Sequence, residues 1–282
     1  MRETVVLIFF RHTNSCPWGL GAMGHSRIRS SIKGRPFREL TALCNHNANS
    51  SAVAGQVLQA AHDDLNYEQL KNNTGYQEAV KLLAHFGLAA QSKDFLGYLR
   101  KIGLNLPDRS SIEDIKAEAM EHIERACAGK PYTDLTEISI NAIATAIQSA
   151  VDKDQNGLLW SPKSEDYLAS LAKLKKAENY AALGQVFFGE VMYRALQKYV
   201  SRQVTTIVGV SERMRTVNEK RNFDRELHDY CMENAKVVKS FCVDWLGLHE
   251  HKLHDVDTAL PGFATYGMEK IFKAMSFYED KQ

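Results

Sequence analysis

The stretch DLTEISINAIATAIQSAV, residues 134–151, decides the fold class of this chain. Its Leu135, Ile138, Ile143 and Ile147 recur every three to five positions, which places them in one apolar stripe along a helix. Working outward in both directions, apolar patterning between polar caps predicts many more helices. They are expected at about 51–64, 67–86, 92–102, 111–127, 163–176, 178–203, 212–246 and 264–279.

Polar residues and glycine mark several of the expected helix ends. Ser110 with Glu113 predicts a capping box at the start of 111–127. Ser211 is expected to cap the long segment 212–246, and Gly247 is expected to end it.

Two short segments depart from the helical pattern. Val5 to Phe10 form an apolar run that predicts a buried strand over 4–10. Residues 204–210 are rich in β-branched side chains, so they either pair with the first run or form the end of the preceding helix. We therefore expect a mostly α fold, a multi-helix bundle with at most two short strands.

The chain divides into an N-terminal arm and a helical domain. Residues 1–40 carry seven Lys and Arg against two acids, a local net charge of +5, and prolines and glycines interrupt regular structure there. We assign 1–38 to a strand followed by a basic arm and 39–282 to the helical domain. The polar stretch 152–162 is a candidate boundary within that domain.

Composition narrows the class of protein. The 282 residues have a formal net charge of +1, with 44% hydrophobic and 24% charged residues, as in ordinary globular domains. The five cysteines include no C-x-x-C pair, which indicates a reducing compartment. The longest apolar run is too short to cross a membrane and lacks a signal-peptide cleavage site. We expect a cytoplasmic protein without membrane contact.

Basic residues gather in two places that suit contact with phosphates. Residues 191–225 carry eight bases against three acids, and a stripe at i, i+4 and i+8 runs along the helix expected there. The candidate nucleic-acid contacts are Arg194, Lys198 and Arg202 in this stripe, with Arg27, Arg29, Lys33, Arg35 and Arg38 in the arm. The alternative is that the stripe docks on the acidic helix 111–127 or is simply solvated.

The stretch RNFDRELHDY, residues 221–230, carries the main candidate for catalysis. Arg221 precedes His228 by seven positions, close to two helical turns, so both side chains would lie on one helix face. An arginine beside a histidine that titrates near neutral pH suits metal-free phosphoryl transfer. The alternative is that the arginines here pair with neighbouring acids on a solvated face.

This R-x6-H-x-Y pattern resembles the R-x4–6-H motif of HEPN-domain ribonucleases, over about ten residues and in a helical setting. The resemblance implies RNA cleavage without metal, commonly at a dimer interface. It gives His228 the role of general acid or base and Arg221 that of phosphate stabiliser, with Asn222 and Tyr230 supporting the geometry. The H-x-Y variant normally has four intervening residues, whereas this chain has six.

Two further segments have the chemistry of metal ligands. His249, His251, His254 and Asp255 fall within a short polar stretch and suit zinc or another divalent ion, although the spacing is not H-E-x-x-H. Residues 152–157 match the start of an EF-hand loop, but Lys163 occupies the twelfth position, where a bidentate glutamate belongs. The alternatives are a polar helix connection and a polar turn, and no cofactor is expected otherwise.

These patterns yield three functional hypotheses. The first is an RNA-cleaving enzyme of HEPN-like type, acting as a homodimer; toxin or phage-defence activity is implied by the resemblance alone. The second is a non-enzymatic helical subunit of a nucleoprotein complex that binds RNA or another nucleic acid. The third is a metal-dependent protein built on residues 249–257.

Overall fold

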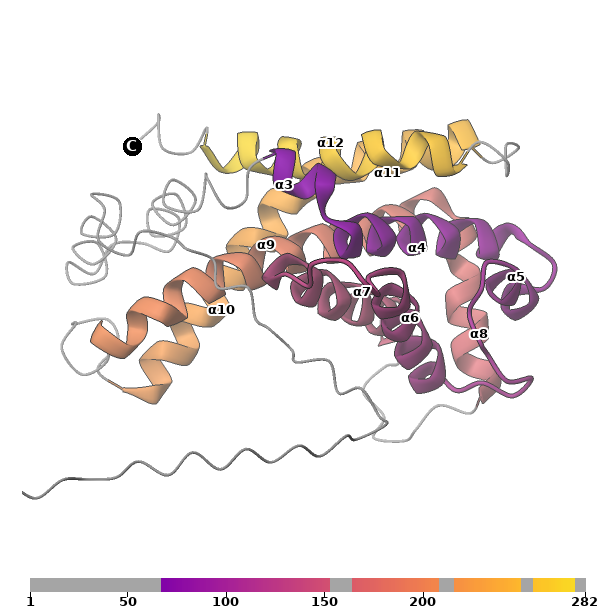
Figure 1. Ribbon diagram of the computed structural model, residues 1–282, viewed down its shortest axis with the longest axis horizontal. Coiled ribbons are helices and arrows are strands. Elements are labelled where there is room, and N and C mark those ends of the chain that lie inside the picture. The colour runs from indigo at the N-terminus through magenta and orange to yellow at the C-terminus, as the bar shows by residue number, and fades with distance from the viewer. Residues whose placement is uncertain (1–66, 153–163, 208–215, 250–255, 277–282) are drawn as a thin grey trace, which may run out of the picture.

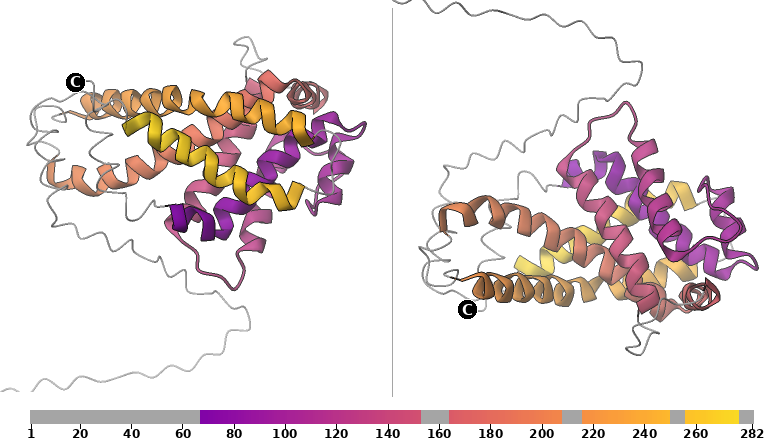
Figure 2. Two further views of the ribbon diagram at one scale, coloured as in Figure 1. Left: turned by 90° about the horizontal axis from the view of Figure 1, so that it is seen from above. Right: turned by 90° about the horizontal axis from the view of Figure 1, so that it is seen from below.

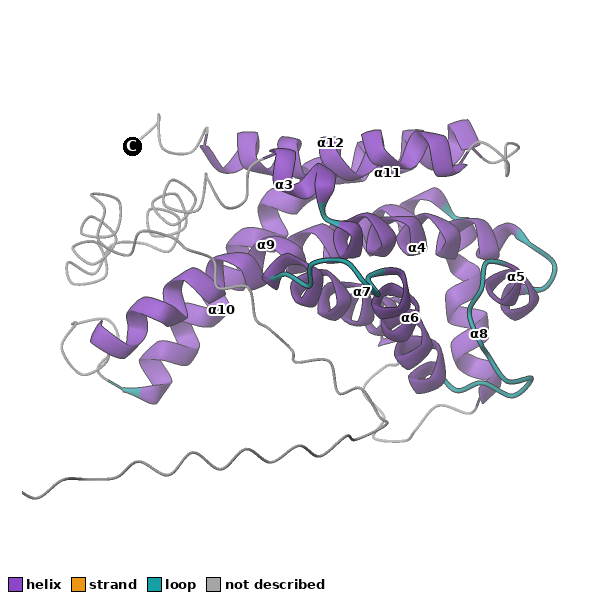
Figure 3. Ribbon diagram, in the orientation of Figure 1, coloured by secondary structure: helices purple, strands orange, loops and turns teal. Residues whose placement is uncertain are grey.

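The computed structural model describes residues 67–152, 164–207, 216–249 and 256–276, which form a bundle of helices (Figures 1 and 3). No strand is found in these ranges, and the expected mostly α, multi-helix fold is confirmed. The α-helices are α3 (Tyr67–Asn72), α4 (Thr74–Gln91), α5 (Phe95–Lys101), α6 (Ile112–Ala126), α7 (Asp134–Asp152), α8 (Ser164–Ala172), α9 (Ala177–Ile207), α10 (Val217–Asn234), α11 (Val238–His249) and α12 (Val256–Ser276). Two 3-10 turns, η1 (Lys173–Lys175) and η2 (Ala235–Val237), lie between them.

Helices α4 and α9 run through the middle of the bundle. Helices α11 and α12 cover one face of this pair, while α7, with α6 behind it, covers the other (Figures 1 and 2). The α4 sequence is apolar on most sides, and accordingly it is buried on all sides but one stripe, where Glu78, Lys81 and His85 are half-buried. Its Tyr76 donates a hydrogen bond of 2.6 Å to the backbone oxygen of Ala264 in α12 and packs against Phe187 of α9. These contacts join the two central helices to each other and to α12.

Small residues let α10 and α11 approach α9 closely. A Cβ atom on Gly189 would lie 2.6 Å from Sδ of Met232 in α10, and one on Gly184 would lie 2.5 Å from Sγ of Cys242 in α11. The side chain of Gln185 also donates a 2.7 Å hydrogen bond to the backbone oxygen of Met232. Helices α9 and α10 are therefore packed tightly where Gly189 and Gln185 lie against Met232, next to Glu190.

Beyond this crossing, α9 and α10 protrude together from the other helices (Figure 1). They run in opposite directions, and the views from above and below show them diverging toward the end of the bundle at which α9 finishes and α10 begins (Figure 2). Helix α7 packs along α9 beside them. The space framed by α7, α9 and α10 contains the polar residues described below.

Several helix ends differ from the expected ones. The expected helix 67–86 is divided at Asn73, whose side chain caps α4 by accepting from the backbone N–H of Tyr76. The capping box of α6 is formed by Ser111 with Asp114, one position after the predicted Ser110 and Glu113. Ser110 is buried instead, with its hydroxyl donating to the backbone of Pro107.

The long helices also differ in their interior. The expected 212–246 helix is interrupted by the 3-10 turn η2 and continues past Gly247 to His249, and the expected 163–176 helix ends in the turn η1. Helix α12 starts at Val256, earlier than the predicted residue 264. The strand predicted over 204–210 is wrong for residues 204–207, which belong to α9. The alternative, that this segment ends the preceding helix, is confirmed for these residues.

Some expectations fall outside the described residues. They include the strand 4–10, the basic arm to residue 38, the helix 51–64, and all of the candidate boundary 152–162 except Asp152, the last residue of α7. Among the helices of the described ranges, none combines the length and the apolar character that crossing a membrane requires.

Candidate functional site

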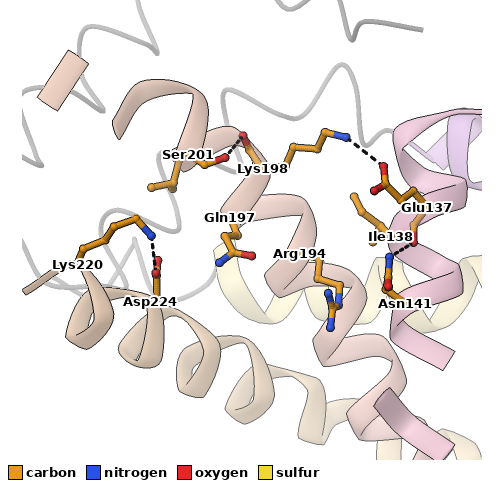
Figure 4. Close-up of a pocket in the computed structure, with 10 residues that line it drawn as sticks. Glu137, Ile138, Asn141, Arg194, Gln197, Lys198, Ser201, Lys220 and Asp224 are labelled. Atoms are coloured by element: carbon orange, nitrogen blue, oxygen red, sulfur yellow. Dashed lines mark hydrogen bonds and ion pairs between the residues drawn. The ribbon is translucent and has the colours of Figure 1, made fainter. Parts of the chain in front are cut away.

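Helices α9 and α10 each carry a polar stripe, and the two stripes meet where Glu190 contacts His228. On α9 the stripe is formed by Glu190, Arg194 and Lys198, spaced four residues apart, and on α10 by Lys220, Asp224 and His228 with the same spacing. The helices are antiparallel, and Glu190 lies against His228. Farther along, Lys198 points to α7, and Lys220 pairs with Asp224 of its own helix (Figure 4). We call these six residues the polar seam.

Glu190 is the most buried residue of the seam. Its side chain is 7% exposed, and each of its two carboxylate oxygens has a separate partner. Nε of Arg194 donates to Oε2 over 2.9 Å, and Nε2 of His228 lies 3.0 Å from Oε1. Burial alone would raise the pKa of the Glu190 carboxyl, but the bonds and positive charges of His228 and Arg194 outweigh it and lower that pKa. The carboxylate is thus ionised in a nearly dry position.

His228 is held at the margin of the seam. Its side chain is 35% exposed, and the Tyr193 ring meets the imidazole edge to face with centroids 5.0 Å apart. The bond with Glu190 raises the pKa of His228, burial opposes the rise, and Asp229 adds to it. Glu190 bonds Nε2 of the imidazole, so the other ring nitrogen, Nδ1, is the one that can exchange a proton with a substrate. Nδ1 lies 3.7 Å from the exposed carboxylate of Asp229.

A groove of about 300 Å³ opens between α7, α9 and α10 (Figure 4). Eight of its ten lining residues are polar or charged, and two are aliphatic. It is lined by Glu137, Ile138, Asn141, Arg194, Gln197, Lys198, Val200, Ser201, Lys220 and Asp224. The groove connects to His228 through Tyr193, whose hydroxyl accepts a 3.0 Å hydrogen bond from Gln197, and through Arg194, which also bonds Glu190.

The predicted basic stripe is paired with acids. Lys198 lies 2.6 Å from Asp134 and 4.0 Å from Glu137, both on α7, and Arg194 bonds Glu190 of its own helix and Thr145 of α7. The stripe therefore docks on α7 and not on the acidic helix α6, which the alternative had named. Nothing is described of the Arg202 side chain, although its backbone is part of α9.

The residues suggested by the R-x6-H-x-Y motif divide into two groups. Arg221 is exposed, and seven residues of α10 bring it back to within about 20° of the His228 direction. At about 100° per residue, Asn222 and Tyr230 point well away from His228. Asn222 is exposed, and Tyr230 packs against the hydrophobic core. The structure thus places Arg221 on the His228 side of the helix and Glu190 directly on the imidazole.

Glu190 and Tyr193 were missed by reasoning from the sequence. One signal for Glu190 was present, since it is the only charged residue of the apolar run 186–193. A carboxylate buried on one helix needs a partner from elsewhere in the fold. That partner, His228, is 38 positions away in the sequence, and no local pattern identifies it.

The other candidate sites lie largely outside the described residues. His249 is the last residue of α11, and the other members of its cluster, His251, His254 and Asp255, lie outside the described residues. The same holds for 153–157 and for the arm residues Arg27, Arg29, Lys33, Arg35 and Arg38. Within the described ranges, no group of three or more His, Cys, Asp or Glu side chains is placed to hold a metal ion.

Comparison with known proteins adds no relative. No family model matches the chain, and neither a curated protein nor a solved structure shows significant similarity to it.

Proposed function

We propose that this protein cleaves RNA without a metal ion and that His228 transfers the proton. The observation that carries the proposal is the 3.0 Å contact between Nε2 of His228 and the buried carboxylate of Glu190, beside a polar groove. A buried carboxylate that holds one nitrogen of a half-exposed imidazole orients the ring and stabilises its protonated form. This is the arrangement expected of a general acid–base group.

In the proposed reaction, Nδ1 of neutral His228 removes the proton from a ribose 2′-hydroxyl. The 2′-oxygen attacks the adjacent phosphorus, the bond to the 5′-oxygen breaks, and a 2′,3′-cyclic phosphate forms. The leaving 5′-oxygen takes a proton from water, and the hydroxide so formed takes up the proton from His228, which returns to its neutral form. Glu190 offsets the charge that develops on the imidazole, and Arg221, exposed on the same side of α10, is suited to stabilise the phosphate.

The test is a cleavage assay on labelled single-stranded RNA with EDTA present. His228→Gln and Glu190→Gln should each lower the rate by about a hundred-fold or more, since acid–base groups contribute about 10²–10⁴. The matched control is His122→Gln, which changes a half-buried histidine of α6 that lies outside the seam. Thermal unfolding of every variant shows whether lost activity reflects lost folding. Equal rates for wild type and His228→Gln would refute the catalytic role.

A non-enzymatic RNA-binding subunit is the second candidate. Arg221 and Arg225 are both exposed and lie one turn apart on the protruding helix α10, which suits contact with a phosphate backbone. If wild type and His228→Gln shift RNA equally in a gel and neither cuts it, this second candidate is favoured. In that case, Arg221→Ala with Arg225→Ala should weaken binding and flatten its salt dependence.

A further inference from the structure

We propose that the groove between α7, α9 and α10 is a binding site for one phosphate-bearing ligand of nucleotide size, and that Arg194 couples its occupancy to protonation of His228. This inference deepens the proposed function by naming the ligand of the same site. Phosphate binding is nevertheless measurable without any cleavage, so the two proposals can fail separately.

The size and lining of the groove suit such a ligand. Its volume of about 300 Å³ is at the lower end of small-molecule sites, enough for a single nucleotide and not for a duplex. Donor groups from two helices line it: the amide of Gln197 and the hydroxyl of Ser201 from α9, and the ammonium of Lys220 from α10. The Ser201 hydroxyl donates to the backbone oxygen of Lys198, and Lys220 pairs with Asp224 over 2.7 Å, so a phosphate would compete with Asp224 for Lys220. Ile138 and Val200 supply an apolar wall. A phosphate needs the donors, and a sugar or base needs the wall.

Arg194 is the residue best placed to hold the phosphate. A guanidinium carries five N–H donors, of which Nε–H bonds Glu190 and one terminal N–H bonds Thr145 over 3.2 Å. The remaining donors belong to a side chain that lines the groove and is 33% exposed. Arginine forks match phosphate oxygens well. By contrast, Lys198 has the nearly buried carboxylate of Asp134 as its partner at 2.6 Å, and it therefore contributes charge more than direct contact.

The coupling arises because Glu190 divides its charge between two partners. One oxygen faces Arg194 and the other faces His228. A phosphate bound to Arg194 weakens the attraction between Arg194 and Glu190. The Glu190 carboxylate then stabilises a protonated His228 more strongly. Linkage requires the converse, so a protonated His228 must strengthen phosphate binding by the same factor. Among the described residues, Asp229 on α10 and Tyr193 on α9 also lie against His228, and Asp224 and Cys231 on α10 lie near Tyr193.

The experiment is titration of the full chain with inorganic phosphate and with uridine 3′-monophosphate, and uridine serves as the ligand without phosphate. Calorimetry in buffers of different ionisation heat gives the number of protons taken up, and NMR follows the His228 imidazole. We expect both phosphates, but not uridine, to bind with net proton uptake at a pH where His228 is partly deprotonated. Glu190→Gln should abolish most of the uptake.

Two groove variants test where the ligand sits. Arg194→Gln should weaken phosphate binding by at least about tenfold, because a charge-assisted hydrogen bond is lost. Lys220→Gln, at the more open edge of the groove, should weaken it by about threefold through loss of one partly solvated charge. Lys273→Gln on α12 is the matched control and should leave binding unchanged.

Three results would overturn the inference: no phosphate binding at millimolar concentration, unchanged affinity in both groove variants, or a His228 signal that does not move at phosphate saturation. Cleavage without phosphate binding in the groove would refute this inference alone. Phosphate binding coupled to His228 without cleavage would support it and refute the ribonuclease.

Discussion

The pair formed by Glu190 and His228 should stabilise the fold in a pH-dependent way. The perturbation is a double-mutant cycle of Glu190→Gln and His228→Gln, which isolates the coupling between the two side chains. A hydrogen bond to a charged group contributes about 1.5–3 kcal/mol to stability. Because the His228 side chain is 35% exposed, water screens part of this. We therefore expect a coupling of about 1 kcal/mol where both groups are charged.

The sign of the pH dependence follows from the two pKa shifts. The pKa of His228 is raised in the folded protein, so its contribution is fully present below the unfolded pKa, about 6.5, and is lost as the pH rises through the folded value. The pKa of Glu190 is lowered, so its contribution is present above about 4.3 and is lost as the pH falls through the folded value. The coupling should therefore be greatest near pH 5.5 and smaller near pH 8.5, as the His228 imidazole loses its proton.

Urea unfolding followed by circular dichroism at the two pH values measures the coupling. The control cycle uses Glu269 and Lys273, an exposed i,i+4 pair on α12 in which both groups remain charged over this range. Its coupling should be small and the same at both pH values. A Glu190–His228 coupling that is equal at pH 5.5 and 8.5, or larger at 8.5, would refute the electrostatic account of the pair.

The remaining predictions concern packing in the core. Tyr76→Phe should lower the free energy of unfolding by about 1–2 kcal/mol, since a buried carbonyl of α12 loses its donor; urea denaturation measures this. Gly75→Ala should destabilise by about 1–3 kcal/mol because the new Cβ would lie 2.5 Å from Cγ2 of Thr136, whereas Gly262→Ala, which meets nothing within 4 Å, should be neutral or stabilising in the same assay. Burial raises the pKa of the Cys242 thiol to about 12, so iodoacetamide at pH 8 should label it only after unfolding, as peptide mass spectrometry would show.

Most helices of the described ranges could be predicted because their signals are local. The apolar stripe of 134–151 and the caps around 111–127 require only neighbouring residues, and α7 and α6 match them within one residue at each end. Helix ends were less predictable where several polar residues compete. Ser110 and Ser111 are both capable of capping α6, and burial of Ser110 under Tyr167, whose hydroxyl bonds its backbone oxygen, leaves the role to Ser111.

The candidate site was only partly predictable, because local patterns do not specify which helices pack together. The motif pointed to His228, and helical periodicity alone placed Arg221 on the same side of α10. The basic stripe was visible in the sequence, but its partners were not. Charge alone does not distinguish α6 from α7 as the docking surface for Lys198, because that choice depends on which helix packs beside α9.

By itself, the sequence determined that the described part of the chain is helical and where most of its helices lie, since apolar periodicity and caps act over a few residues. The tertiary structure decided what those helices do together. It set Glu190 against His228 across 38 positions of sequence, and it assembled one groove from three helices. Both depend on the faces that meet when apolar surface is buried, and close packing at Gly189 selects among faces that the sequence pattern leaves equivalent.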